Sequence, residues 1–277
     1  MIAALAATAF AYDAHAALRV RVRHRAALGG ARAQIVTFAG ADGVPVTAEI
    51  VAPAKAGARG PGVLFVHWLG DPQTTNHTEF EPDAIALAKR GVTSVLLDAW
   101  WSAPQWGTRD WFVQVRSPET DYADSIAEVK KFRRALDLLD AQPGVDPARV
   151  AFVGHDFGAM YGALLAGVDR RPKWYVLLAG NPSFSQWFLL GKKPADVAAY
   201  TAQMAPLDPL PCLARSRAKA FLFQYALRDR YITPQSEAAF FAAAPPPRAM
   251  FVYDATHALA VPQALSDRLA WLEARIF

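Results

Sequence analysis

The stretch from Arg149 to Gly167 carries the clearest chemical signal in this sequence. It reads "RVAFVGHDFGAMYGALLAG": an apolar strand, a turn bounded by Gly154 and Gly158, and a helix of small residues. This pattern is typical of a nucleophile elbow, a strained strand-to-helix turn that exposes one reactive side chain. The exposed position holds Asp156, where the motif usually has serine. A buried or helix-capping aspartate is the alternative interpretation.

Two later residues complete a possible triad. Asp229 follows one apolar strand-like run and His257 follows the next, in the chain order nucleophile, acid, histidine. All three would meet at the carboxyl edge of a parallel sheet, so we expect Asp156 as nucleophile, Asp229 as acid and His257 as base. The alternatives are an arginine ion pair for Asp229 and a surface-loop position for His257. Substitute acids are Asp208 and Asp254.

A reaction at this turn also needs backbone N–H donors for developing negative charge. Phe157 supplies one, because it opens the helix after Asp156. We expect the second from the loop "VHWLGDP", in which Trp68 or Leu69 follows a buried strand. His67 ends that strand, and we interpret it as structural.

Two segments interrupt the strand-helix alternation and are the expected walls of a substrate pocket. One is the tryptophan-rich segment 99–115, and the other is segment 181–211, a possible lid insertion. Each follows a strand end, where ligands of open α/β sheets bind. Ordinary surface packing is the alternative for both. The expected pocket residues are Trp100, Trp101, Trp106, Tyr161 and Trp187.

Strand and helix patterns alternate along most of the chain, which predicts an α/β fold with a mainly parallel sheet and helices on both faces. Residues 33–38 and 44–53 indicate a hairpin, and residues 18–25 an exposed edge strand. We expect one domain over residues 1–277, with 1–32 as an N-terminal extension. The predicted central strands are 63–67, 92–98, 149–154, 173–180, 218–226 and 248–254. The predicted helices include 81–91, a long one capped near Ser117, and 262–276.

Composition argues against several classes of function. The 277 residues are 53% hydrophobic and 19% charged, which is typical of a folded chain with a sizeable core. The densest basic run alternates arginine with apolar residues, as an edge strand does, so we expect no nucleic-acid partner. No apolar run approaches the roughly 20 residues of a membrane span. The alanine-rich start lacks the basic region of a secretory signal. Because Cys212 is the only cysteine, we expect a cytoplasmic protein without metal or cofactor.

These residues resemble the α/β-hydrolase superfamily, and within it the dienelactone hydrolase branch. The similarity rests on "VLFVHWLG", "GVDPARVAFVGHDFGAMYGALLA" and "LRDRYITP…ATHAL", and it extends from about Ala33 to the end of the sequence. That branch usually has a cysteine or serine nucleophile, whereas "GHDFGA" is similar to the elbow of epoxide hydrolases and haloalkane dehalogenases, which use aspartate. The dehalogenases typically place a halide-binding tryptophan after the nucleophile, where this chain has Phe157. Halide binding would then need one of Trp100, Trp101, Trp106, Trp111 and Trp187.

An aspartate nucleophile suits displacement at a saturated carbon, since attack on a carbonyl would give a reactive mixed anhydride. We therefore expect an epoxide hydrolase or dehalogenase that acts on a small apolar organic substrate with water. Asp156 forms an alkyl ester, and His257 activates the water that cleaves it. One alternative is an ester or lactone hydrolase in which Asp156 holds a water, and another is a non-catalytic binding protein. The candidate acids for epoxide opening are Tyr122, Tyr161, Tyr200 and Tyr231.

Overall fold

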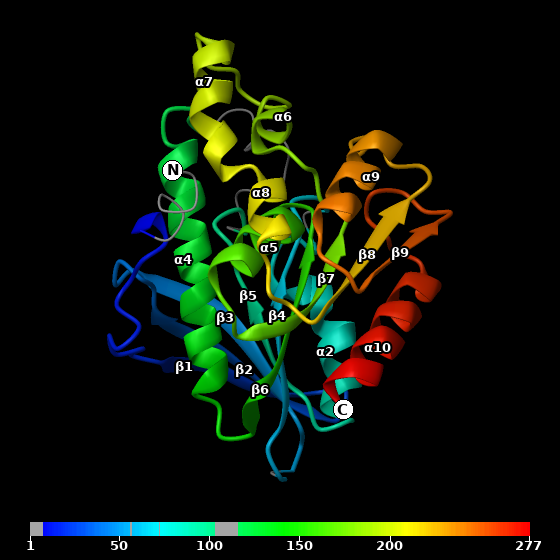
Figure 1. Cartoon of the computed structure of the whole chain (residues 1–277). Helices are drawn as coiled ribbons and strands as arrows, with labels where there is room; N and C mark the ends of the chain where they lie inside the picture. Colours follow the sequence, from blue (N-terminus) through cyan, green and yellow to red (C-terminus); the bar gives the residue numbers. More distant parts are fainter. Residues whose placement is uncertain (1–7, 56, 72, 103–115) are drawn as a thin grey trace.

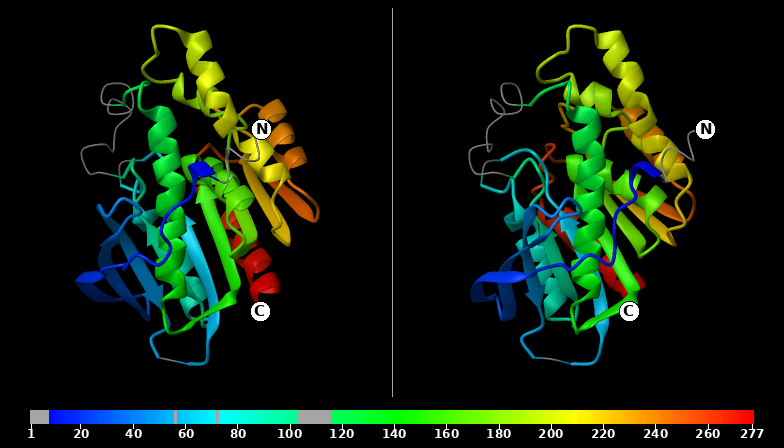
Figure 2. Two further views of the ribbon diagram at one scale, coloured as in Figure 1. Left: turned by 60° about the vertical axis from the view of Figure 1, so that its left-hand side comes forward. Right: turned by 90° about the vertical axis from the view of Figure 1, so that its left-hand side faces the viewer.

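The computed structural model describes residues 8–55, 57–71, 73–102 and 116–277, and these form one nine-stranded sheet covered by helices (Figures 1 and 2). The strand order is β1-β2-β3-β5-β4-β6-β7-β8-β9. The strands from β5 to β9 in this order pair in parallel, and β1, β2 and β3 join them antiparallel. Their bounds are β1 Arg21–Leu28, β2 Ala31–Ala39, β3 Pro45–Ala52, β4 Gly60–Val66, β5 Thr93–Leu97, β6 Val145–His155, β7 Pro172–Leu178, β8 Ala220–Ala226 and β9 Arg248–Tyr253. The mainly parallel sheet predicted from the sequence is confirmed.

Helices lie on both faces of this sheet. On one face α2 and α10 pack together, and on the other α5 packs against α4 and α8 (Figure 1). Among the described helices, none combines the length and the apolar character needed to cross a bilayer. The bounds are η1 His77–Phe80, α2 Glu81–Ala88, α4 Asp121–Asp140, α5 Phe157–Val168, α6 Phe184–Phe188, α7 Val197–Met204, η3 Ala205–Leu207, α8 Pro209–Ala214, α9 Pro234–Ala243 and α10 Pro262–Ile276.

The central strands are apolar throughout because each face of the sheet packs on its own core. In β4, Leu64 and Val66 belong to the core under α4 and α5, whereas Val63 and Phe65 belong to the core under α2 and α10. All four side chains are at most 1% exposed. Two-sided burial is the reason that the strand pattern here is a continuous apolar run rather than an alternating one.

Within the described part of the N-terminal region, residues 21–28 form a strand of this sheet and Phe10 packs in the layer that covers it. As predicted, β1 is an exposed edge strand, with arginines along it. Phe10 is buried against α4, and Arg133 of that helix donates to the carbonyl of Phe10 at 2.6 Å. The helix itself begins later than predicted, at Asp121 after Thr120, so Ser117 is not its cap.

Segment 181–211 contains α6, α7, η3 and the start of α8, and α6 and α7 stand beyond the carboxyl ends of the central strands (Figure 1). Arg116 ties α6 to the start of α4, because its guanidinium donates to the carbonyls of Phe188 and Lys192 and pairs with the Asp121 carboxylate. Tyr200 also donates to Asp121, at 2.6 Å. Of the other expected pocket wall, residues 103–115 lie outside the described residues.

The turn between β6 and α5 leaves no room for side chains at its two glycines. A Cβ on Gly154 would lie 2.4 Å from the carbonyl oxygen of Gly158, and a Cβ on Gly158 would lie 2.2 Å from that of Val66. Real Cβ atoms do not approach backbone oxygens so closely, so both positions require glycine. The close approach presses the first turn of α5 against the end of β4.

This close approach predicts that Gly158→Ala destabilises the protein. The added methyl group meets backbone rather than a flexible side chain, so we expect the free energy of unfolding to fall by about 3 kcal/mol or more. Urea unfolding followed by circular dichroism measures it. Gly57→Ala is the matched control, because a Cβ there meets nothing within 4 Å. Equal stability of the two variants would contradict the packing argument.

Candidate active site

Asp156 lies at the turn between β6 and α5, with backbone angles φ 55° and ψ −115°. A left-handed conformation costs a non-glycine residue about 1–3 kcal/mol, and such residues cluster at functional sites. The side chain is only 1% exposed and makes no capping hydrogen bond to α5. The capping interpretation is therefore wrong, and the turn instead presents the carboxylate toward the loops that follow β4 and β9.

His257 lies between the carboxylates of Asp156 and Asp229. Its Nδ1 is 2.7 Å from Asp229 Oδ2, and its Nε2 is 3.9 Å from Asp156 Oδ1. The other oxygen of Asp229 accepts the backbone N–H groups of Tyr231 and Ile232, at 2.8 and 3.0 Å. This fixed carboxylate keeps the proton of His257 on Nδ1, so Nε2 faces Asp156.

The substitute acids predicted from the sequence are engaged elsewhere. Asp208 accepts the backbone N–H of Phe184 at 2.9 Å. Asp254 forms an exposed ion pair with Arg228. Asp229 is thus the acid that contacts His257 among the three residues considered.

The two carboxylates dominate the electrostatics of His257. Burial lowers its pKa, but attraction from the carboxylates of Asp156 and Asp229, together with the hydrogen bond to Asp229, outweighs burial and raises the pKa to about 9. Since a free histidine titrates near 6.5, this side chain stays protonated at neutral pH when both carboxylates are ionised. The geometry of the site therefore favours the imidazolium form of His257.

The two oxygens of Asp156 have different surroundings. Oδ2 accepts the backbone N–H of Leu69 at 3.1 Å. Oδ1 is buried and has no hydrogen-bond partner within the described part of the chain, and 3.9 Å to His257 exceeds hydrogen-bond length. Of the two expected donors in this loop, the N–H of Trp68 instead donates to Glu79 Oε2 at 2.8 Å. Phe157 begins α5 directly after Asp156, where the prediction places the other donor.

A part-buried pair that sequence reasoning missed braces these loops. Nδ1 of His155 is 2.6 Å from Glu79 Oε1, and its Nε2 donates to the backbone carbonyl of His257 at 3.0 Å. The His155 ring also stacks on Trp68, with centroids 5.0 Å apart. The pair joins the elbow to the loops after β4 and β9. Because 76 residues separate its members, no local pattern pointed to it.

Aromatic rings surround the imidazole of His257. The ring of Tyr231 lies 5.1 Å away, that of Trp187 5.7 Å away and that of Trp68 6.0 Å away, between centroids. Of the predicted pocket residues, Trp187 thus reaches the triad. Tyr231, one of the four tyrosines considered as an acid, does so as well.

The remaining predicted pocket residues are Trp100, Trp101, Trp106 and Tyr161. Trp101 and Tyr161 have no accessible surface, so their prediction as pocket-lining residues is wrong. The indole N–H of Trp101 donates to the carbonyl of Trp68, and the hydroxyl of Tyr161 bonds to Ser125. Their rings instead fill the core around Phe157. The ring of Trp100 lies 6.2 Å from that of Phe157, and Trp106 falls outside the described residues.

His67 is structural, as its place at the end of a strand predicts. Its Nε2 accepts the backbone N–H of Ala99 at 3.1 Å, so the proton lies on Nδ1, which donates to the carbonyl of Trp68 at 2.8 Å. Burial lowers its pKa to about 4 and keeps the ring neutral. His67 therefore anchors the loop that carries Leu69 and takes no part in the triad.

A cavity of about 1150 Å³ opens between the N-terminal segment, β3 and α4. Val46, Trp100 and Tyr122 are among the residues that line it, whereas Asp156, Asp229 and His257 are not. This cavity is separate from the triad.

Comparison with known proteins places this arrangement among α/β-hydrolase folds. Acetyl xylan esterase from Paenibacillus sp. R4 is similar with a TM-score of 0.76 and 18% identity, over 99% of this chain and 94% of that one. Acetyl xylan esterase 1 from Thermoanaerobacterium sp. JW/SL YS485 gives 0.77 and 16%, over 100% and 93%. A protein of Klebsiella pneumoniae subsp. pneumoniae MGH 78578 that is designated a dienelactone hydrolase gives 0.62 and 16%, over 93% and 98%. The expected fold is confirmed.

Sequence comparison reaches less of the chain. Polyketide transferase ATR5 of Stachybotrys chlorohalonatus (strain IBT 40285) is 26% identical over 129 residues, which is 47% of this chain and 39% of that protein. The match thus spans about two fifths of the curated relative's length. No model of a protein family matches the sequence.

The position of His257 between two carboxylates predicts an unusual titration. We expect the imidazole of His257 to titrate with a pKa of about 9. In the Asp156→Asn variant we expect a lower pKa, because only the carboxylate of Asp229 then counteracts the lowering by burial. Histidine ring resonances followed by NMR between pH 5 and pH 11 measure both values. A wild-type pKa at or below the ordinary value of about 6.5 would contradict the geometry described above.

Proposed function

We propose that this chain is a hydrolase whose reaction takes place at Asp156, with His257 as the proton-transferring group and Asp229 as its orienting partner. The contact that carries this proposal is the imidazole of His257, held at 2.7 Å by Asp229 and directed at Asp156 from 3.9 Å. Left-handed backbone at the elbow and burial of both carboxylates add support, since neither is needed for packing alone. The aromatic rings around His257 favour a small apolar organic substrate.

For the bond that is cleaved, a carboxylic ester or lactone is the first candidate. Support comes from the similar structures, which include two acetyl xylan esterases and a designated dienelactone hydrolase. These neighbours favour the ester or lactone alternative over the epoxide or halide chemistry that the aspartate first indicated.

The proposed ester route uses water directly. Atoms 3.9 Å apart can both lie about 2.8 Å from one water oxygen, so a water fits between Asp156 Oδ1 and His257 Nε2. Asp156 takes a proton from this water, whose oxygen attacks the acyl carbon. The protonated His257 then gives its Nε2 proton to the departing alkoxide. A proton then passes from Asp156 to His257 and restores both groups, so that one water is consumed and an acid and an alcohol are released.

Covalent catalysis through an alkyl ester of Asp156 is the second candidate, on an epoxide or a carbon–halogen bond. The hydrogen bond from Leu69 to Oδ2 favours it, because Oδ1 is then the oxygen open to attack a saturated carbon. Ester formation removes the charge of Asp156, so the pKa of His257 falls and the ring can serve as a base toward water. The Leu69 N–H then stabilises the oxyanion of that second step.

The leaving group distinguishes the two forms of this covalent candidate. Tyr231 is the proposed acid for an epoxide oxygen, because its ring lies 5.1 Å from that of His257. A departing halide needs N–H donors, and Phe157 has none on its ring. Trp187 is the proposed donor in that case, at 5.7 Å from His257 between ring centroids.

We propose that segment 181–211 covers the substrate beside the triad. Trp187 of α6 supports this role by its contact with His257. The anchor of α6 on Arg116 would keep this wall in place.

Isotope labelling separates the two candidates. In a single turnover in heavy-oxygen water, the ester route leaves Asp156 unlabelled and puts the label in the acid product, whereas the covalent route labels the Asp156 carboxylate. Mass spectrometry of the peptide that contains Asp156 gives the answer.

If the protein turned over no p-nitrophenyl ester, lactone, epoxide or haloalkane, that result would contradict both routes. As a control, His257→Gln should accumulate an alkyl adduct on Asp156 only if the covalent route operates, since the base for its hydrolysis is then missing.

A further inference from the structure

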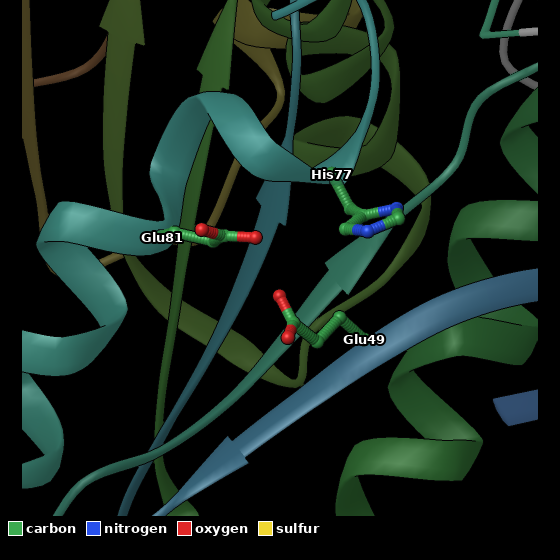
Figure 3. Close-up of side chains that lie close together, drawn as sticks. All are labelled: Glu49, His77 and Glu81. Carbon is green, nitrogen blue, oxygen red and sulfur yellow. The ribbon is translucent and has the colours of Figure 1, made fainter. Parts of the chain in front are cut away.

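A second cluster of charged side chains lies at the start of α2, outside the triad. Glu49 comes from β3, His77 from η1 and Glu81 from the first residue of α2 (Figure 3). One oxygen or nitrogen of each residue lies within 4.8 Å of the corresponding atoms of the others. The three side chains converge from two directions on one point.

Glu49 is the unusual member, because its carboxylate is buried without compensation. The residue is 5% exposed, and its Oε2 has no hydrogen-bond partner among the residues that the structure describes. The carboxylate points toward His77 and Glu81 (Figure 3). A bound cation would offset the cost of this burial, since buried charges in proteins are paired or coordinate metals.

His77 is already oriented as a metal ligand. Its Nδ1 is 2.8 Å from Asp98 Oδ1, and its backbone N–H donates to the same oxygen at 2.9 Å. Because a carboxylate accepts, Nδ1 carries a proton, and Nε2 is the ring nitrogen left to bind an ion. Such a carboxylate–histidine arrangement is the usual outer support of a metal-bound imidazole.

We infer that Glu49, His77 and Glu81 bind one divalent transition-metal ion, for which zinc is the best match. Zinc binds both imidazole nitrogen and carboxylate oxygen, whereas magnesium and calcium prefer oxygen ligands alone. Ligand atoms around tetrahedral zinc are roughly 3.4 Å apart, so atoms that lie within 4.8 Å of one another need to close by at most about 1.4 Å. No local pattern pointed to this site, because its ligands come from two distant segments and include no cysteine.

The bound ion would fasten the segment that braces the triad. Glu79 lies between His77 and Glu81 in the chain, and its carboxylate holds the N–H of Trp68 and the ring of His155. Fixing both ends of this short segment to Glu49 of β3 would hold Glu79 in place. The ion acts as a positioning element, and its binding does not depend on which reaction the triad performs.

The test begins with full-length protein treated with a chelator and then dialysed. Titration calorimetry with zinc chloride should give one site, and the melting temperature should rise with zinc. Glu49→Gln and Glu81→Gln should each weaken binding at least tenfold, while Glu119→Gln, a change of an exposed glutamate before α4, should leave it unchanged.

Cobalt provides a second measurement on the wild-type chain, in case a variant folds poorly. Cobalt bound at this site should give visible absorption bands of a nitrogen- and oxygen-ligated ion, and zinc should displace them. No zinc binding to the wild-type protein would overturn the inference. So would binding that survives both glutamine variants but is lost in Asp229→Asn, since that would place the ion at the triad.

Discussion

The close approach between the first turn of α5 and the end of β4 governs the whole site. At Gly158 the backbone of the helix comes so near the carbonyl of Val66 that no side chain fits between them. The loop that follows Val66 is thereby brought over the elbow, where the N–H of Leu69 meets Asp156. This placement has a conformational cost, because Gly154 and Gly158 have no room for a side chain and Asp156 between them adopts a strained backbone conformation.

The charges at the site are balanced across three elements. Asp156 comes from the turn after β6, Asp229 from the loop after β8 and His257 from the loop after β9. Burial alone would keep the imidazole neutral, and either carboxylate alone would be costly to bury. Together they form a compact group in which the imidazole lies between two side chains of opposite charge type, and each lowers the cost of burying the others. The Glu79–His155 pair adds a second layer that joins the same loops.

Much of this arrangement could be predicted from the sequence because it depends on local patterns. The apolar runs located the central strands, and the helix predicted at 262–276 matches α10. The order Asp156, Asp229, His257 was enough to predict that these residues meet, since each follows a parallel strand. Contacts between distant segments could not be predicted in this way. The Glu79–His155 pair, the cluster at Glu49 and the burial of Trp101 depend on side-chain packing across the sheet.

The nature of the reaction is where sequence motif and fold differ. Aspartate at the elbow indicates displacement at saturated carbon, and the similar structures include esterases. Both routes require the carboxylate of Asp156, so its removal tests the central claim most directly. The account predicts that Asp156→Asn, with an unchanged fold by circular dichroism, loses activity on the best substrate by about 10³-fold or more in kcat/KM. A kcat/KM within tenfold of the wild-type value would contradict it.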